Sequence, residues 1–290
     1  MTTTPPPTPG TALWVHAHPR RSSLNGHLFR EGVRALSADR EVATSDLHAQ
    51  GFDPVLGPRD FAGHDLAGHD LADRAGEPGG IAELLGEAHR RGQLPPDVTA
   101  EQAKLARAEL LVLQFPLWWY GPPAILKGWF DRVLTAGFAF GDTDPDLGVP
   151  RRYGDGGLAG RRALVVVTAG EDARSIGPRG VSGDLDSLLF PLTHGVLWYV
   201  GIETLALHVV HDADALGTAG LDREVDRLRE RLRTLDAEPA RPYRRLRDGD
   251  YAGTRALRAD LLPGRTDLGI HCAADDPPGA RVNGGPARPR

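Results

Sequence analysis

Three short segments of this chain gather side chains that could hold a ligand. In the first, HPRRSSLNG, the hydroxyl groups of Ser22 and Ser23 and the amide of Asn25 stand where a helix is predicted to begin. Free backbone N–H groups and the helix dipole make such an end a site for phosphate or another anion. Serine and asparagine are also the preferred helix caps, so capping without a ligand explains this segment better when it is taken alone.

The second segment, PLWWYGPP, places Trp118, Trp119 and Tyr120 in succession before a Gly-Pro-Pro turn. Prolines at the first helical positions make such a turn rigid. Aromatic side chains usually belong to the core. Three adjacent ones cannot all point inward from one short loop, so at least one is expected to line a cavity or an interface.

The third segment, VVVTAGEDAR, ends an apolar run in Thr168, Ala169 and Gly170. Small residues let a ligand approach backbone N–H groups closely, although a plain strand-to-helix turn would also explain them. The chain lacks both GxGxxG and GxxxxGK[ST], which disfavours ordinary dinucleotide-binding and nucleoside-triphosphate-binding classes. An anion-binding loop, an aromatic loop and a small-residue loop together favour a flavin or a similar flat, phosphorylated cofactor.

The elements that position these segments alternate along the chain. Apolar runs predict strands at residues 11–18, 41–47, 109–117, 161–170 and 202–210. Helical spacings predict helices after residue 24, at 81–92 and 99–108, from Pro122 or Pro123 to 135, and at 183–199 and 221–235. This alternation predicts an α/β fold, a doubly wound, parallel, five-stranded sheet in flavodoxin-like order. Ligands bind such sheets at the carboxyl ends of the strands, which is where all three segments lie.

The composition sets the broad class of the protein. A net charge of -5 and a pI near 6.1 give no basic surface for nucleic acid or acidic membranes. No apolar run reaches the ~20 residues that span a bilayer, and the first residues do not read as a secretory signal. We therefore expect a cytoplasmic protein. The single cysteine, Cys272, excludes a disulfide framework.

We expect a disordered tail at residues 1–10, a flavin-binding domain at 11–236, and a C-terminal extension with a flexible tail at 237–290. Residues 59–80 form a low-complexity excursion in which AGHDL occurs twice. Its side chains of His64, Asp65, His69 and Asp70 are of types that bind metals. A solvated polar repeat explains them better, because the glycine-rich setting offers no helical scaffold, so no metal site is predicted.

Longer motifs make a family visible. AHPRRSSLN, SDLHAQGFDPV, FPLWWYGPPAILKGWF and GDLDSLLFPLTHGVLWYVG resemble the FAD-dependent NAD(P)H:quinone oxidoreductases of the DT-diaphorase type. The resemblance covers roughly residues 12–235 well and 236–272 thinly. It implies a homodimer with active sites at the subunit interface. It also implies a ping-pong reaction, in which NAD(P)H gives a hydride to FAD and a quinone in the same slot takes one back.

The resemblance also implies roles for individual residues. FAD-pyrophosphate contacts fall on His18, Ser22, Ser23, Leu24 and Asn25; isoalloxazine contacts on Pro116, Leu117, Trp118, Trp119, Tyr120, Thr168, Ala169 and Gly170; and the substrate pocket on Trp119, Tyr120, Phe140 and Tyr199. NAD(P)H acts as co-substrate, and FMN in place of FAD stays open.

Two positions depart from the family. Its tyrosine–histidine pair, which balances charge on the reduced flavin, falls near Ser175 and at Ser182, and a second pocket tyrosine falls at Asp142. We expect the backbone of the 168–171 turn, including Gly170, to replace the pair. Ser182 would then give a neutral hydrogen bond and Arg174 the missing cation, with Arg179 a solvated surface charge.

The leading interpretation is a flavin-dependent NAD(P)H oxidoreductase acting on a quinone or a similar flat acceptor. A dedicated biosynthetic reductase for a larger aromatic metabolite is the first alternative, because Asp142 replaces an aromatic residue. An ancillary regulatory flavoprotein of a potassium-efflux system is the second alternative. For that protein, residues 59–80 would be the candidate partner surface.

Overall fold

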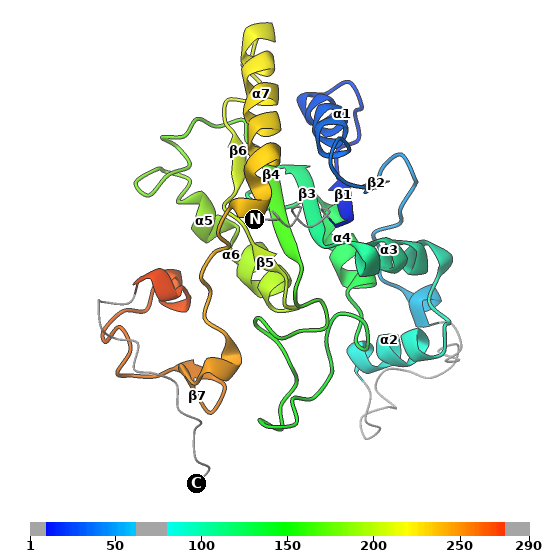
Figure 1. The fold of residues 1–290 in the computed structure, drawn as a ribbon, viewed down its shortest axis with the longest axis vertical. Coiled ribbons are helices and arrows are strands. Elements are labelled where there is room, and N and C mark those ends of the chain that lie inside the picture. Colours follow the sequence, from blue (N-terminus) through cyan, green and yellow to red (C-terminus); the bar gives the residue numbers. More distant parts are fainter. Residues whose placement is uncertain (1–9, 62–79, 276–290) are drawn as a thin grey trace, which may run out of the picture.

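A parallel sheet forms the centre of the molecule (Figure 1). The computed structural model describes residues 10–61 and 80–275. The main strands are β1 (Ala12–His16), β2 (Val42–Asp46), β3 (Leu110–Pro116) and β4 (Arg162–Thr168), with the short β5 (Glu203–Thr204) and β6 (His208–Val210) beside β4. Their order is β2-β1-β3-β4-β5, every pairing is parallel, and β6 also pairs with β4. The predicted flavodoxin-like sheet is confirmed.

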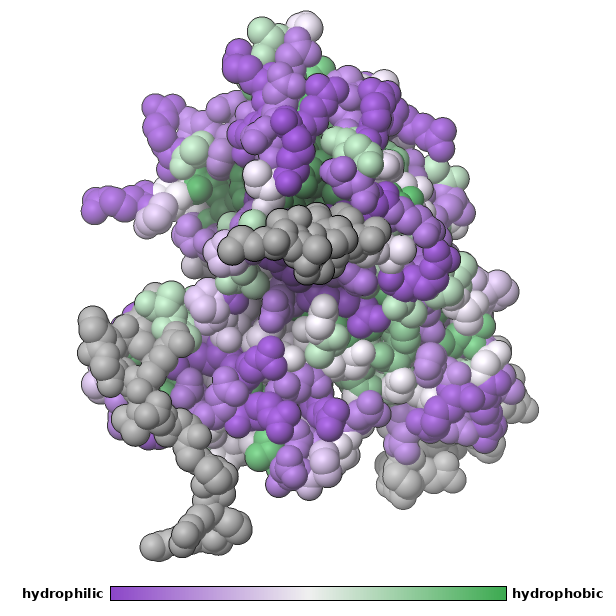
Figure 2. Space-filling model, viewed as in Figure 1, coloured by the Kyte–Doolittle hydropathy of each residue, from purple (hydrophilic) through white to green (hydrophobic). Residues whose placement is uncertain are grey.

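Helices cover both faces of the sheet. On one face lie α1 (Leu24–Leu36) and α7 (Thr218–Thr234), and on the other lie α3 (Pro96–Arg107) and α4 (Ala124–Val133). Successive strand residues point to opposite faces. Trp14 of β1 therefore joins the core under α1 and α7, whereas Leu13 and Val15 join the core under α3 and α4. The outward side of α7 is mostly hydrophilic (Figure 2).

A smaller apolar cluster lies beside this sandwich. It joins α2 (Ile81–Arg90), η1 (Pro58–Phe61) and α3 through Leu85, Phe61 and Val98. The 59–80 excursion begins within η1 and ends just before α2, and its residues 62–79 fall outside the described residues, as do 1–9 and 276–290. The predicted tails, and the polar repeat for which no metal site is predicted, lie outside the described residues and stay predictions.

The predicted helix at residues 183–199 is interrupted. The segment divides into α5 (Leu185–Leu188), α6 (Phe190–Leu192) and the π-helical η3 (Thr193–Trp198). Pro191 has no N–H to donate within the turn. The π-helical winding of η3 is seen in one hydrogen bond, in which the amide of Tyr199 donates to the carbonyl of His194, five residues back.

The predicted strand at 202–210 is likewise divided, because one extra residue enters it. Thr204 pairs with Ala163 and His208 with Val166, so three residues on this strand face two on β4. An extra residue of this kind breaks the ladder locally, as in a β-bulge.

The C-terminal segment packs against η3. It contains η4 (Leu235–Ala237), η5 (Leu246–Asp248), β7 (Tyr251–Ala252), β8 (Ala256–Leu257), η6 (Leu268–His271) and η7 (Ala273–Asp275). The hydroxyl groups of Tyr243 and Thr193 lie 2.9 Å apart, and the indole N–H of Trp198 donates to the carbonyl of Arg244 at 3.0 Å. The proposed domain boundary at 236 stays a prediction. No helix in the described part of the chain has both the length and the apolar character needed to cross a membrane.

Candidate active site

The carboxyl ends of β1, β3 and β4 meet around a cleft of about 480 Å³, which we name the anion cleft. All three predicted segments contribute to it, as expected from the order of the strands. Its lining comprises His18, Pro19, Arg20, Ser23, Leu24, Asn25, Pro116, Leu117, Trp118, Thr168, Gly170, Ala213 and Asp214. Of the residues expected to contact a cofactor, Ser22 is exposed nearby but does not line the cleft.

The amino end of α1 gives the cleft its anion-binding character. Ser23 caps the helix, because its side-chain oxygen accepts from the amide of Gly26 at 3.1 Å. In the described part of the chain, no oxygen accepts from the backbone amides of Leu24 and Asn25. Such orphan amides at a helix start are suited to phosphate oxygens. Burial lowers the pKa of His18, which favours a neutral imidazole beside them.

The side chain of Asn25 points into the protein. Its amide donates to the hydroxyl of Thr168 at 2.6 Å, and Gln114 donates to its backbone carbonyl at 2.7 Å. Gln114 in turn accepts from the indole N–H of Trp14 at 2.9 Å. Asn25 thus fixes the start of α1 against β3 and β4. Sequence analysis missed Gln114, although a lone glutamine inside an apolar strand is a signal for such a buried network.

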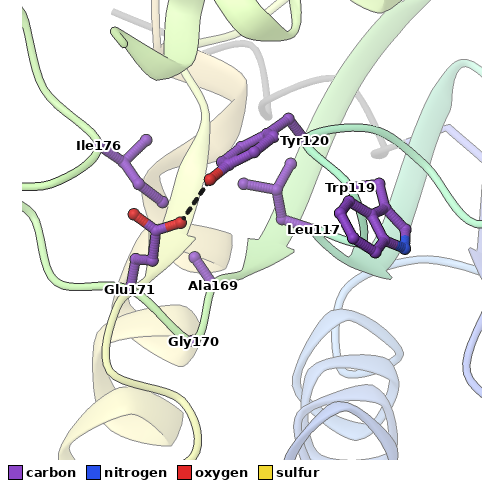
Figure 3. Close-up of a pocket in the computed structure, with 7 residues that line it drawn as sticks. All are labelled: Leu117, Trp119, Tyr120, Ala169, Gly170, Glu171 and Ile176. Carbon is purple, nitrogen blue, oxygen red and sulfur yellow. Dashed lines mark hydrogen bonds between the residues drawn. The ribbon is translucent and has the colours of Figure 1, made fainter. Parts of the chain in front are cut away.

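A second pocket of about 180 Å³, which we name the acceptor pocket, adjoins the cleft (Figure 3). Its lining comprises Leu117, Trp119, Tyr120, Ala169, Gly170, Glu171 and Ile176. The hydroxyl of Tyr120 donates to one carboxylate oxygen of Glu171 at 2.9 Å, and that of Ser182 donates to the other at 2.7 Å. The two hydroxyl oxygens lie 3.1 Å apart. This contact ties the loop after β3 to the loop after β4.

The aromatic loop is held in a strained turn. Trp119 and Tyr120 have φ angles of 50° and 60°, and the amides of Trp118 and Gly121 exchange hydrogen bonds with each other's carbonyls. Two consecutive left-handed residues define a type I′ turn, which normally contains asparagine and glycine. A non-glycine residue in this conformation costs roughly 1–2 kcal/mol. Strain of this kind tends to occur at functional sites, and the indole of Trp119 is 96% exposed beside the pocket.

Known proteins show the same architecture. Residues 11–234 match the family described as having a flavodoxin-like fold. A ribosyldihydronicotinamide dehydrogenase-like protein of Penicillium crustosum is 36% identical over 83% of this chain and 86% of its own length. NAD(P)H dehydrogenase [quinone] 1 of Rattus norvegicus is 36% identical over 69% of this chain and 68% of its own. A solved structure from Klebsiella pneumoniae, described as a candidate quinone reductase, is 37% identical with a TM-score of 0.79, covering 91% of this chain and all of that one.

The chain belongs to the NAD(P)H:quinone oxidoreductase family. The predictions of family, of fold and of a flavin-dependent oxidoreductase activity towards quinones are thereby confirmed. The roles predicted for individual residues stay predictions.

In this oxidoreductase, Arg174 lies away from both pockets. Its side chain is 91% exposed and forms an ion pair with Asp172. That guanidinium holds the pKa of the Asp172 carboxyl well below its usual range. The structure therefore does not bring Arg174 to the place where the prediction needs a cation. Ser182 does reach the acceptor pocket, through its bond to Glu171. Sequence analysis missed Glu171, although an acid directly after Gly170 was a visible signal.

Phe140 and Tyr199 form a separate aromatic group. Their ring centroids lie 6.0 Å apart, and Tyr153 lies 5.3 Å from Tyr199. Neither Phe140 nor Tyr199 lines the anion cleft or the acceptor pocket of its own chain. Asp142, which replaces the second family tyrosine, is exposed.

The residues present fit a flavin. Beside the amides at the start of α1, those of Gly170 and Glu171 also have no acceptor among the described residues. Gly170 lies where the cleft and the pocket meet, and a Cβ added there would lie 2.9 Å from a carboxylate oxygen of Asp214. The free amides of Leu24 and Asn25 suit a phosphate, and those of Gly170 and Glu171 suit the polar edge of a flat ring.

Proposed function

We propose that this oxidoreductase binds FAD non-covalently and uses it to reduce a quinone or a similar flat aromatic acceptor with NAD(P)H in a ping-pong reaction. The observation that carries this proposal is that the anion cleft and the acceptor pocket adjoin and share Leu117 and Gly170. One ligand with a phosphorylated end and a flat end can therefore occupy the cleft, with its ring at the mouth of the pocket.

When bound, the flavin supplies the two-electron chemistry that protein side chains lack. The chain's own residues bind and orient the reactants. The amides of Leu24 and Asn25 would hold phosphate oxygens, and those of Gly170 and Glu171 would donate to the polar edge of the ring, where negative charge develops. Leu117, Trp118 and Trp119 would provide the apolar walls.

The visible spectrum of the purified protein tests the proposal. We expect flavin absorption, release of the flavin on denaturation, and identification of the released molecule as FAD rather than FMN by chromatography. Reduction of a simple quinone by NADH or NADPH should show the parallel kinetic lines of a ping-pong reaction. A colourless protein that takes up no added flavin would rule the proposal out.

We further propose a homodimer in which the partner subunit completes each active site. Phe140 and Tyr199 line neither the anion cleft nor the acceptor pocket, and the side chains of Trp119 and Val181 are each 96% exposed. Exposed apolar side chains that together form a patch mark an interface. Light scattering should give twice the monomer mass at micromolar concentration. A fully active monomer would contradict this proposal. The predicted cytoplasmic location stays a prediction that cell fractionation can test.

A further inference from the structure

The acceptor pocket contains one carboxylate between apolar and aromatic walls. Glu171 lies at the carboxyl end of β4, opposite Tyr120, and Leu117 and Ile176 complete the surroundings (Figure 3). The close-up shows the carboxylate directed towards the Tyr120 hydroxyl, while the indole of Trp119 lies on the far side of Leu117. A carboxylate in such surroundings is expected to have a charged partner or a role in binding.

The neighbours of Glu171 hold its carboxylate in place without neutralising it. Each of its oxygens accepts one hydrogen bond, from the neutral hydroxyl of Tyr120 or of Ser182. An ionised carboxylate has about four acceptor positions, so it retains capacity for further donors. Arg174, the nearest arginine along the chain, pairs with Asp172 instead. Within residues 10–61 and 80–275, no side chain forms an ion pair with Glu171.

Two further features favour positive charge in this pocket. The carboxylate of Asp214 lies beside Gly170, where the pocket meets the anion cleft, so the local charge is negative from two sides. Aromatic faces also attract cations, and Trp119 and Tyr120 both line the pocket. A cation placed there gains from both effects, whereas an anion meets like charge at short range.

We propose that Glu171 determines acceptor specificity, so that the pocket prefers flat aromatic compounds carrying a cationic nitrogen over neutral or anionic rings of the same size. Tyr120 and Ser182 are the positioning residues that hold the carboxylate in its orientation. The inference rests on the proposed function for what becomes of the bound compound, but the binding preference itself needs no turnover.

Binding of three matched rings tests the inference. Isothermal titration of the purified protein, without NAD(P)H, would compare 9-aminoacridine, acridine and acridine-9-carboxylate at pH 7.5, where they are cationic, neutral and anionic. We expect the cation to bind at least tenfold more tightly than acridine, and the anion more weakly than acridine. Glu171→Gln should bring the cation to within threefold of acridine while leaving acridine binding unchanged. Glu171→Asp should retain most of the preference.

The matched control is Asp39→Asn. This exposed aspartate precedes β2, at the opposite edge of the sheet, and its replacement removes the same charge. Equal affinities in the unmodified protein, an unaltered preference in Glu171→Gln, or an equal loss in Asp39→Asn would each overturn the inference. Unchanged acridine binding and near-ultraviolet circular dichroism show whether Glu171→Gln is folded. Flavin content and quinone reduction are measured separately, so that failure of the proposed function is distinguishable from failure of this inference.

Discussion

Asn25 and Ser22 are neighbours at the start of α1, yet their side chains have different surroundings. Asn25 is 3% exposed and donates to the hydroxyl of Thr168, whereas Ser22 is exposed. Asn25→Ala leaves the buried Thr168 hydroxyl without this partner, a loss that costs roughly 1–3 kcal/mol. Urea unfolding of the flavin-free protein should show that decrease, while Ser22→Ala should lie within about 0.5 kcal/mol of the unmodified protein. Equal stability of the two variants would contradict the assigned role of Asn25.

The hydroxyl of Ser22 is free to meet a cofactor phosphate. If it does, Ser22→Ala removes one hydrogen bond to a charged group, which is worth roughly 1.5–3 kcal/mol. Flavin affinity, measured by fluorescence quenching, should then fall on the order of tenfold to a hundredfold, while the flavin-free protein keeps its stability. Unchanged affinity would mean that the backbone amides of Leu24 and Asn25 hold the phosphate without help from this side chain.

At the scale of the element, the turn at residues 118–121 is strained and holds the indole of Trp119 exposed. Trp119→Gly relieves the strain of a non-glycine residue in the left-handed conformation, which stabilises the folded chain by roughly 1–2 kcal/mol. The flexibility of glycine in the unfolded chain offsets part of that stabilisation. The free energy of unfolding should therefore change by less than about 1 kcal/mol. The KM for the quinone should rise severalfold, because the wall of the pocket is lost.

Trp129 in α4 provides the contrast to Trp119. It is 0% exposed, and its indole N–H donates to the buried carboxylate of Glu101 at 2.8 Å. Trp129→Gly should destabilise by roughly 3–5 kcal/mol or more, as large-to-small core changes do. A similar loss in Trp119→Gly would show that the exposed indole also packs in the folded chain.

Arg132 of α4 joins η1, α3 and the loop after β2. Its side chain is 0% exposed, its Nε donates to the buried Asp60 at 2.8 Å, and its Nη1 donates to Asp97 of α3 at 2.6 Å and to the carbonyl of Asp53 at 2.7 Å. Removing one partner of a buried pair costs roughly 3–5 kcal/mol, because the other charge stays buried.

Thermal and urea unfolding should show that loss in Arg132→Met, whereas Arg34→Met is a surface control at an exposed arginine paired with Glu31. The double variant Arg132→Met/Asp60→Ala should be less destabilised than the sum of the two single changes, because neither charge is then left alone. Strict additivity would show that the pair does not act as a unit.

For the whole molecule, the sequence determined the sheet because its strands are continuous apolar runs buried on both faces. The run around Val112 and the run around Val165 illustrate this, and the ligand segments follow from the position of the strand ends. Local patterns did not show the π-helical turn at Thr193 or the extra residue after Thr204, since both depend on tertiary packing.

Contacts between residues far apart in the sequence were the other feature that sequence analysis could not predict. The bond between Tyr120 and Glu171 joins residues 51 positions apart, and that between Gln114 and the Asn25 carbonyl spans 89. No local spacing encodes such pairs. Sequence analysis could therefore assign candidate side chains to the three loops at the strand ends, whereas their hydrogen-bond partners could be found only in the fold.

Three buried histidines affect the stability of the whole molecule. His16 and His208 are 1% exposed and His194 is 8% exposed, and each has at least one ring nitrogen without a hydrogen-bond partner in the described structure. Burial lowers the pKa of His16 and His194 to about 4 and that of His208 to about 3. The nearby Asp46 opposes the shift at His16 only in part.

These lowered pKa values predict that stability falls as the solution becomes acidic. Below pH 6.5 the unfolded chain binds protons at these histidines, whereas the folded chain does not. The free energy of unfolding therefore decreases as the pH is lowered, until the pH passes the folded pKa values near 4 and 3. Each histidine should lower the free energy of unfolding by about 1–2 kcal/mol between pH 6.5 and 5. Ordinary carboxylates titrate mostly below this window. Urea unfolding at saturating flavin should therefore show a steep slope there, reduced in His208→Gln and unchanged when the exposed His48 is replaced by glutamine. A flat profile from pH 7 to 5 would show that the buried rings can be protonated without unfolding.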